Sequence, residues 1–500
     1  MGKGFDRRLQ VMRSAPMKTA VALAPVMILV AASGCLSIPA PSSESTLASA
    51  PALSATIKNA SQDGIPSGDW PGGKWWEAFG DPGLNALVER AQSGSPDIKT
   101  AQARARLAMN IAMASGATTK PKIATGAGLM GQRFSENSWL PTEFITNPMY
   151  QADISADLAW NLDLWGAARL AAEGKIGAHN AAEAEAQAVR LAVTTAVARG
   201  WLRYAGVREL AGIAREALAS RMESLALAQK KAERGLETQL NVERARFAAL
   251  IVEDALASLA GAEEQERNHL AALAGLGPDE GALLPEPAAA LQIPAALPEN
   301  VPLDLVRRRP EIAAAKWRVE AAAKNIGAAR AAFYPNVNLR ALAGLQSIAL
   351  DKLLAAGSLT YTASAAVHLP LYDGGALSGN LGAAHAEYDM AVERYNQALV
   401  TAAKETADAI AQINAIGRQM EIAGRALATA KKIHELVLAR FNKGLDDYMT
   451  ALKAQDDVFE QARKSAQLKS AMAAARVALC AALGGGFFDN QTISVEAGGK

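Results

Sequence analysis

The sequence predicts a mainly α-helical protein that also contributes strands to a membrane β-barrel. Most of the 500-residue chain reads as alanine-rich helix. Four short stretches instead alternate between apolar and polar residues, which is the period of a strand with one apolar and one polar face. The two halves of the chain also repeat each other. Together these observations predict two homologous halves, each with long helices and two strands.

The alternating stretches lie at 122–134, 149–162, 336–346 and 358–370. In the last of them, one face carries Leu359, Tyr361, Ala363, Ala365, Val367 and Leu369. Stretches of this length match the tilted strands that cross a bilayer. The alternative is a soluble β-sandwich with one buried face. The membrane interpretation is favoured because the apolar faces are rich in alanine and no other strand is predicted to cover them.

An internal repeat relates the two halves. Residues 96–123 align without gaps on 310–337, and two prolines match at the same offset. Further along, "ERGLETQLNVERA" (233–245) pairs with "NKGLDDYMTALKA" (442–454). A repeat of this size indicates duplication of a half-molecule rather than a solenoid.

The repeat and the flanking composition define the expected organisation. It comprises a signal peptide over 1–34, a lipidated tether over 35–74, a first structural repeat over 75–276, a proline-rich linker over 277–303, a second repeat over 304–486 and a C-terminal tail over 487–500. Each repeat has the order helix, two strands, very long helix, glycine turn, helix. The linker is too rich in proline for a helix.

Long uninterrupted helices are predicted over 166–234 and 375–443, each about 100 Å in length. The shorter helices, 97–120 and 238–274, sum to nearly the same length. Two seams follow the 3-4 spacing of coiled coils. The first comprises Ile413, Ile416, Met420, Ala423, Leu427, Ala430, His434, Val437 and Phe441, and the second comprises Val242, Ala245, Ala249, Val252, Leu256 and Leu259.

The N-terminus has the layout of a secretory signal peptide. Basic residues precede the apolar run "TAVALAPVMILVAA" (19–32), which is too short to span a bilayer as a typical helix. Translation could also start at Met12 or Met17.

The stretch "AASGC" resembles a bacterial lipoprotein cleavage box. The resemblance implies that Cys35 becomes the lipidated first residue, although Ala32 stands where the pattern most often has leucine. Leu36, rather than aspartate, implies sorting to the outer membrane. The alternative is ordinary cleavage near Ala32, with Cys35 an incidental thiol.

Several function classes are excluded. A formal net charge of +1 argues against a broad nucleic-acid surface. Two cysteines and five histidines show neither a disulfide framework nor metal-ligand spacing. "GAGLMG" (126–131) fits a dinucleotide motif but lies inside a predicted strand, not before a helix. We expect no enzyme, no metal site and no cofactor.

Four strands cannot close a membrane barrel, since the smallest bacterial barrels need eight. An open sheet edge in lipid would leave backbone groups unpaired at several kcal/mol each. At least two copies must therefore assemble, with their polar faces around a water-filled lumen.

Six segments carry a family resemblance: "WWEAFGDPGLNALVERA" (75–91), "LVRRRPEIAAAKWRVEAA" (305–322), "FYPNVNL" (333–339), "LPLYDGG" (369–375), "RFNKGLDDYMTALKAQ" (440–455) and "AALGGGFF" (481–488). In this order they resemble the outer membrane factor family, the TolC-like efflux channels, in its lipoprotein branch. The resemblance implies a homotrimer in the outer membrane of a Gram-negative bacterium. Its 12-stranded β-barrel would continue as a periplasmic α-helical barrel.

The resemblance further implies two partners, a periplasmic adaptor and an inner-membrane, proton-driven pump, and export of small molecules such as drugs. One alternative is a channel of the same fold that exports proteins; the lipid anchor and "RRRPEI" favour small molecules. The other is a lipidated periplasmic adaptor. An adaptor would have one helical hairpin between β-rich domains, not two homologous halves.

Glycine turns are expected at the ends of the long helices. Gly235-Leu236 and Gly444-Leu445 suit the left-handed residue that ends a helix, and Asp446 or Asp447 can cap the next helix. The resemblance implies that these tips meet the adaptor; the alternative is that they are only turns.

A gate is expected just beyond the second turn. The resemblance places an apolar ring at Met449 and an acidic ring at Lys453, which share a helix face. Lys453 departs from this pattern, because three ammonium groups around an axis would repel each other. Asp456 and Asp457 could offset that charge. Arg440, which precedes the turn, is another candidate for an ion pair that holds the gate closed. The alternative is that these are ordinary solvated helix charges.

Overall fold

The computed structural model describes residues 42–53, 55–58, 65–66, 68–135, 137, 139, 149–288, 298 and 301–489. The predicted signal peptide and Cys35 lie outside these residues. The chain divides into two compact units. One contains Met109–Gly177 and Glu320–Met390, and the other contains Thr46–Ala108, Ala178–Val319 and Ala391 onward.

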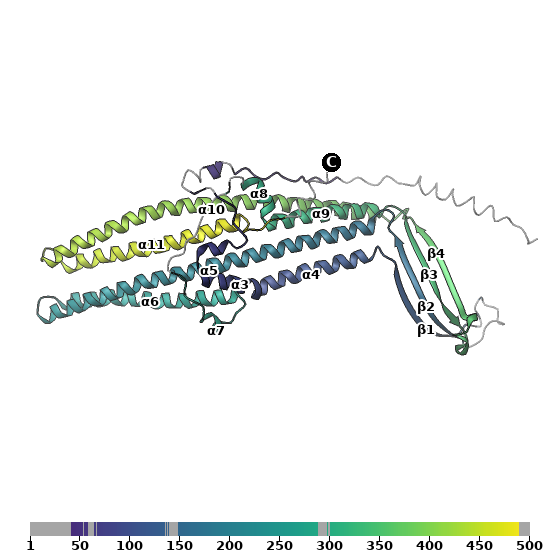
Figure 1. Ribbon diagram of the computed structural model, residues 1–500, viewed down its shortest axis with the longest axis horizontal. Coiled ribbons are helices and arrows are strands. Elements are labelled where there is room, and N and C mark those ends of the chain that lie inside the picture. The colour runs from purple at the N-terminus through teal and green to yellow at the C-terminus, as the bar shows by residue number, and fades with distance from the viewer. Residues whose placement is uncertain are drawn as a thin grey trace, which may run out of the picture. The chain divides into compact units, whose positions relative to one another are not determined.

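The first unit holds a four-stranded antiparallel sheet in the order β1-β2-β3-β4 (Figure 1). Its strands are β1 (Lys122–Gln132), β2 (Met149–Leu162), β3 (Asn336–Ser347) and β4 (Leu359–His368). Two short 3-10 turns, η3 (Leu350–Lys352) and η4 (Ala356–Ser358), lie between β3 and β4. All four strand predictions are confirmed to within two residues at each end.

The register of the sheet aligns the apolar positions of all four strands. Leu158 of β2 lies opposite Ile123 of β1 and Ala341 of β3, and Ala341 lies opposite Ala363 of β4. Directly opposite residues of an antiparallel pair share a face, and side chains alternate along each strand. The sheet therefore has one continuous apolar face and one mainly polar face.

The helices of the two halves match in length. The first half has α4 (Pro96–Ala117), α5 (Ala167–Glu233) and α6 (Gln239–Leu273), and the second has α9 (Pro310–Ala331), α10 (Ala376–Asn442) and α11 (Tyr448–Ala482). In each half these helices have 22, 67 and 35 residues. The predicted helix order is confirmed. Among the described residues, no helix is both long and apolar enough to cross a membrane.

Shorter elements precede or join these helices: η1 (Trp75–Phe79), α3 (Pro82–Gly94), α7 (Pro278–Gly281) and α8 (Val301–Arg308). The linker is therefore not free of helix. Pro278 occupies the first position of α7, where its missing N–H costs nothing because that group would have no helical partner.

The predicted seams are the buried stripes of the helices. On α10, Ile413 and Ile416 are buried against Met472 and Leu479 of α11. On α6, the positions of the second seam are buried or half-buried throughout its length. The spacing of three and four residues holds along each helix because it keeps one stripe facing the neighbouring helix.

The motif "WWEAFGDPG" folds around a buried carboxylate. Asp81 caps α3 by accepting hydrogen bonds from the backbone N–H groups of Gly83 (2.8 Å) and Leu84 (3.2 Å). It also accepts hydrogen bonds from Trp201 Nε1 of α5 (2.8 Å) and from Ala288 N (3.0 Å). Because each lone pair has a donor, burial of this charge is compensated. The motif thus joins α3, α5 and the linker.

Three consecutive glycines follow α11. Gly484, Gly485 and Gly486 all have positive φ (90°, 55° and 82°). A Cβ on Gly484 would collide with the carbonyl oxygen of Arg308, and one on Gly486 would collide with the backbone of Gly72. Only glycine fits this left-handed, closely packed backbone.

Two further contacts hold the segment after the glycines in place. Asp489 N donates to the carbonyl oxygen of Arg307 (3.0 Å). The guanidinium carbon of Arg308 lies 4.7 Å from the centroid of the Trp70 ring and 5.1 Å from the centroid of the Phe488 ring. The C-terminal segment and residues 70–73 therefore both pack against the end of α8.

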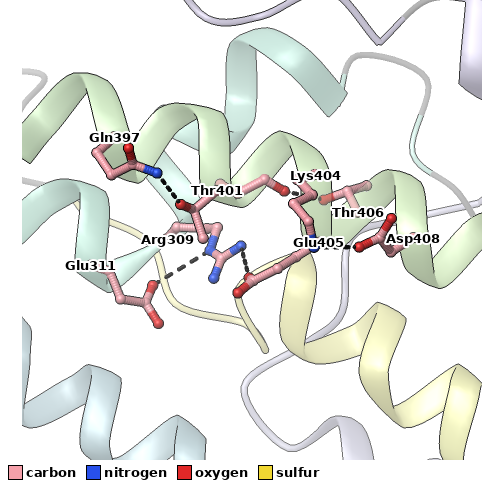
Figure 2. Close-up of polar contacts among 9 residues, drawn as sticks. Arg309, Glu311, Gln397, Thr401, Lys404, Glu405, Thr406 and Asp408 are labelled. Atoms are coloured by element: carbon pink, nitrogen blue, oxygen red, sulfur yellow. Dashed lines mark hydrogen bonds and ion pairs between the residues drawn. The ribbon is translucent and has the colours of Figure 1, made fainter.

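The "RRRPEI" segment is tied to α10 by a buried arginine (Figure 2). Arg309 Nη1 lies 2.6 Å from Glu405 Oε2, and its Nε lies 3.4 Å from Glu311 Oε2. The Arg309 side chain is buried, whereas both carboxylates remain partly exposed. Because a buried guanidinium left without its carboxylate is costly, this pair fixes the junction of α8 and α9 on α10.

Candidate functional site

Both long helices end in the same turn. Gly235 (φ 71°) follows α5 and Gly444 (φ 73°) follows α10. Leu236 N donates to Lys231 O (2.8 Å) and Gly235 N donates to Ala232 O (3.0 Å). The second turn repeats this pair of bonds, from Leu445 N to Arg440 O (3.0 Å) and from Gly444 N to Phe441 O (2.9 Å). These bonds define a Schellman motif.

The leucine of each turn is exposed. Such a leucine commonly packs back on its own helix. Here the side chains of Leu236 and Leu445 remain 72% and 63% exposed. Each hairpin therefore ends in an apolar side chain that the chain itself leaves uncovered.

Charged residues organise the second turn. Asp447 caps α11, accepting hydrogen bonds from Thr450 N and Thr450 Oγ1 (both 2.7 Å). The Thr450 hydroxyl, with the backbone N–H, holds the pKa of Asp447 below its ordinary value. Arg440 Nε lies 2.6 Å from Asp446 Oδ2, and this hydrogen bond raises the pKa of Arg440. The Arg440 side chain is thus held by an ion pair within its own turn. It makes no described contact with Asp456 or Asp457.

The two hairpins pack together near their ends. Leu225 of α5 and Val242 of α6 lie in one buried cluster with Tyr448 and Leu452 of α11. Lys231 Nζ sits 4.4 Å from the centroid of the Phe441 ring. The position of the first tip is therefore coupled to the start of α11.

Met449 and Lys453 lie one turn apart on the first turns of α11. Met449 is 37% exposed and Lys453 is also exposed. Within the described ranges, Lys453 makes no ion pair. The apolar and basic side chains that the sequence analysis assigned to the gate are therefore available to groups outside the chain.

Asp456 contacts a residue that sequence reasoning missed. Arg221 of α5, whose side chain is only 1% exposed, forms an ion pair with Asp456 and donates to Gln455 Oε1 (2.9 Å). Its guanidinium also lies 5.8 Å from the centroid of the Phe459 ring. Burial raises the pKa of Asp456; Arg221 opposes this shift and Asp457 adds to it. The pair connects the first half of the chain to the second.

One signal could have revealed Arg221. Ala217, Arg221, Leu225 and Ala228 are all buried and follow the 3-4 spacing of a seam. A single charge in such a seam has to meet an acid or a polar group on a neighbouring helix.

These contacts join turns and helices of the described chain. Among the described residues, no group of three His, Cys, Asp or Glu side chains could hold a metal ion. Cys480 is buried, and burial raises the pKa of its thiol to about 11. The notable geometry is instead structural: exposed hairpin tips, a charged link between two helices and a sheet with two unlike faces.

Known proteins resemble this chain in sequence and in fold. The profile of the family "Outer membrane efflux protein" matches residues 87–276 and 301–485. The multidrug resistance outer membrane protein MdtP of Escherichia coli (strain K12) is 30% identical over 441 residues, covering 86% of this chain and 90% of MdtP. The fusaric acid resistance protein FusA of Burkholderia cepacia is 34% identical over 381 residues, covering 75% and 71%.

A solved structure agrees with both the fold and the sequence. The outer membrane protein VceC of Vibrio cholerae is 32% identical and superposes with a TM-score of 0.78, covering 84% of this chain and 100% of VceC. The chain therefore belongs to the outer membrane efflux protein family and is the outer membrane channel component of an efflux system, not an enzyme.

Proposed function

We propose that three copies of this chain form a channel that carries small organic molecules across the outer membrane. A periplasmic adaptor and an inner-membrane, proton-driven pump would deliver the cargo. One observation carries the proposal: the register places the apolar residues of all four strands on one face. Such a sheet suits a barrel with lipid outside and water inside.

The edges of the sheet support assembly from several copies. Within the described chain, β1 and β4 each pair with only one strand. In lipid an unpaired edge costs several kcal/mol for each backbone group, so other copies must complete it. Three copies would give twelve strands, the number that the family resemblance implies.

The names of relatives support small molecules as cargo. One relative is called a multidrug resistance protein, another a fusaric acid resistance protein, and a third, from Pseudomonas putida, a toluene efflux pump protein. Protein export is the second candidate, and no feature of the described chain favours it.

Deleting the gene tests this function. We expect the deletion strain to become several-fold more susceptible to apolar antibiotics, solvents or fusaric acid. Expression of the wild-type chain from a plasmid restores resistance. Unchanged susceptibility together with failed secretion of a protein would favour the alternative.

We also propose that Cys35 carries acyl chains that anchor the mature N-terminus in the outer membrane. The support is the "AASGC" sequence that follows the apolar run. Lipid would supplement a barrel that is already embedded, so Cys35→Ser should lose the lipid and keep much of the assembly. Mass spectrometry of the mature N-terminus decides this; an unmodified Cys35 contradicts it.

We also propose a gate at the start of α11. In three copies, Met449 would form an apolar constriction, with Lys453 one turn beyond it. The link from Arg221 to Asp456 would hold α11 against α5 and keep this end narrow. Asp457 and Arg440 do not form this link in the described chain, so we assign them no part in it.

Replacing Met449 tests the constriction. We expect the wild-type channel to conduct poorly in planar bilayers and Met449→Ala to raise conductance or opening frequency severalfold, because it removes the side chain that narrows the pore. Single-channel recording measures both. Leu283→Ala, at an exposed leucine outside α11, is the matched control. A wild-type channel that is already wide open, or a Met449→Ala channel with unchanged conductance, would place the gate elsewhere.

A further inference from the structure

The charged residues on the polar face of the sheet lie at different heights along the strands. Each such height is called a level. Lys122 of β1 and Arg340 of β3 both lie opposite Ala159 of β2. The two cations therefore flank Ala159 on the same face. Both side chains are exposed, and in the described structure neither forms an ion pair. They make a basic level at the strand ends that adjoin the helices.

Asp157 lies close to this basic level. It is two residues along β2 from Ala159, so it occupies the diagonal position to both Lys122 and Arg340. Diagonal neighbours on a sheet are about 7–8 Å apart. Ser155 Oγ also donates to Asp157 Oδ2 (3.2 Å). Asp157 therefore has two cations as diagonal neighbours on the polar face.

Asp153 has no cation at the opposite or diagonal positions of the described strands. It lies four residues beyond Asp157 on the same face, about 13 Å from Asp157 along the strand and about 20 Å from the basic level. Its directly opposite neighbours are Gly128 of β1 and Gln346 of β3. Neither neighbour is charged, so a single carboxylate dominates this level of the polar face.

Gly128 of "GAGLMG" leaves room for that carboxylate. A Cβ on Gly128 would lie 2.8 Å from Asp153 Oδ1. A larger residue at this position would displace the acid. Gly126 and Gly128 also fall on the polar face, since they lie opposite Ser155 and Asp153. The packing of Asp153 thus accounts for Gly128 of this motif, whereas a Cβ on Gly131 would instead meet the ring of Tyr150.

We propose that these levels sort ions inside the exit: Asp153 enriches cationic solutes in the outer part, and Lys122 with Arg340 enriches anionic solutes nearer the helices. The inference rests on the proposed channel, in which the polar face lines the lumen. Each copy repeats the levels, so like charges form rings that concentrate counterions. Salt screens a charge over about 8 Å at physiological ionic strength, so the effect grows as salt falls.

A reporter thiol on the polar face tests the acidic level. Gln151→Cys places a thiol two residues from Asp153 on the same face. Reaction rates with a cationic and an anionic methanethiosulfonate are compared in the assembled protein at about 20 mM ionic strength, where charges act over about 20 Å. The chain without this thiol supplies the background. We expect the cationic-to-anionic rate ratio to fall about threefold when Asp153→Asn is added.

Two further variants sharpen the test. Glu387→Gln removes one exposed carboxylate from α10 and should leave the ratio unchanged. With the thiol at Asn161→Cys instead, beside the basic level, Arg340→Gln should raise the ratio. Equal ratios with and without Asp153→Asn overturn the inference while the channel stands. A Gln151→Cys thiol that reacts with neither reagent overturns the channel itself, because the polar face is then not in water.

Discussion

Replacing both tip leucines, as Leu236→Asp with Leu445→Asp, is expected to abolish efflux while the protein still accumulates in the outer membrane. The two side chains are largely exposed and contribute little to the fold of the chain. If they bury against an apolar adaptor surface, each carboxylate would cost about 2 kcal/mol or more at the contact. The measurements are drug susceptibility and the amount of protein in the outer membrane fraction.

Matched variants separate docking from folding in this experiment. Leu236→Met with Leu445→Met keeps an apolar tip and should retain efflux. Leu283→Asp makes the same change at a leucine that is 83% exposed but lies after α7, and should also retain it. Full resistance in the double aspartate variant would show that the tips are only turns.

Gly484→Ala is expected to remove most folded protein from the outer membrane. The added Cβ meets the carbonyl oxygen of Arg308, and the residue must keep a φ of 90°. Backbone strain of this kind costs about 1–3 kcal/mol, and overpacking adds about as much. Their sum is a large part of the stability of a typical domain. Quantitative immunoblotting of membrane fractions measures the loss.

The same substitution at another glycine provides the control. Gly261 lies within α6, and a Cβ there meets nothing within 4 Å in the chain. Gly261→Ala should stabilise the helix by up to about 1 kcal/mol, since alanine is the better helix former. Equal amounts of the Gly484→Ala and Gly261→Ala proteins would contradict the role assigned to the glycine run.

Periodicity predicted the elements because each pattern extends over many residues. Strand bounds such as 149–162 and the length of α5 follow from alternation and from the absence of proline, which are local properties. The partner of a side chain is not local. Arg221 meets Asp456 across 235 positions of sequence, and no repeat or spacing relates the two. The sequence therefore predicted a gate at the start of α11 without predicting the link of α11 to α5.

Two other contacts show the same limit. Arg440 and Asp446 are six residues apart, but their ion pair depends on the turn at Gly444, whose bonds fix the approach of the two side chains. The motif "AALGGGFF" carried the family resemblance, yet its physical role emerged only with Arg308 and Gly72 beside it. A motif in the sequence shows that a position is restricted. The neighbouring residues in the folded chain show which contacts restrict it.

The equal helix lengths of the two halves have a consequence for symmetry. Each chain forms two helical hairpins, each built from one helix of 67 residues and one of 35 residues. The turns at Gly235 and Gly444 close these hairpins with the same pattern of backbone hydrogen bonds. Three chains would then present six quasi-equivalent tips, although the rotational symmetry of such a trimer would be only threefold. In a partner ring of six subunits, each subunit could contact one hairpin tip. A threefold ring would have to distinguish "GLET" at 235–238 from "GLDD" at 444–447, two turns with one backbone and different charges.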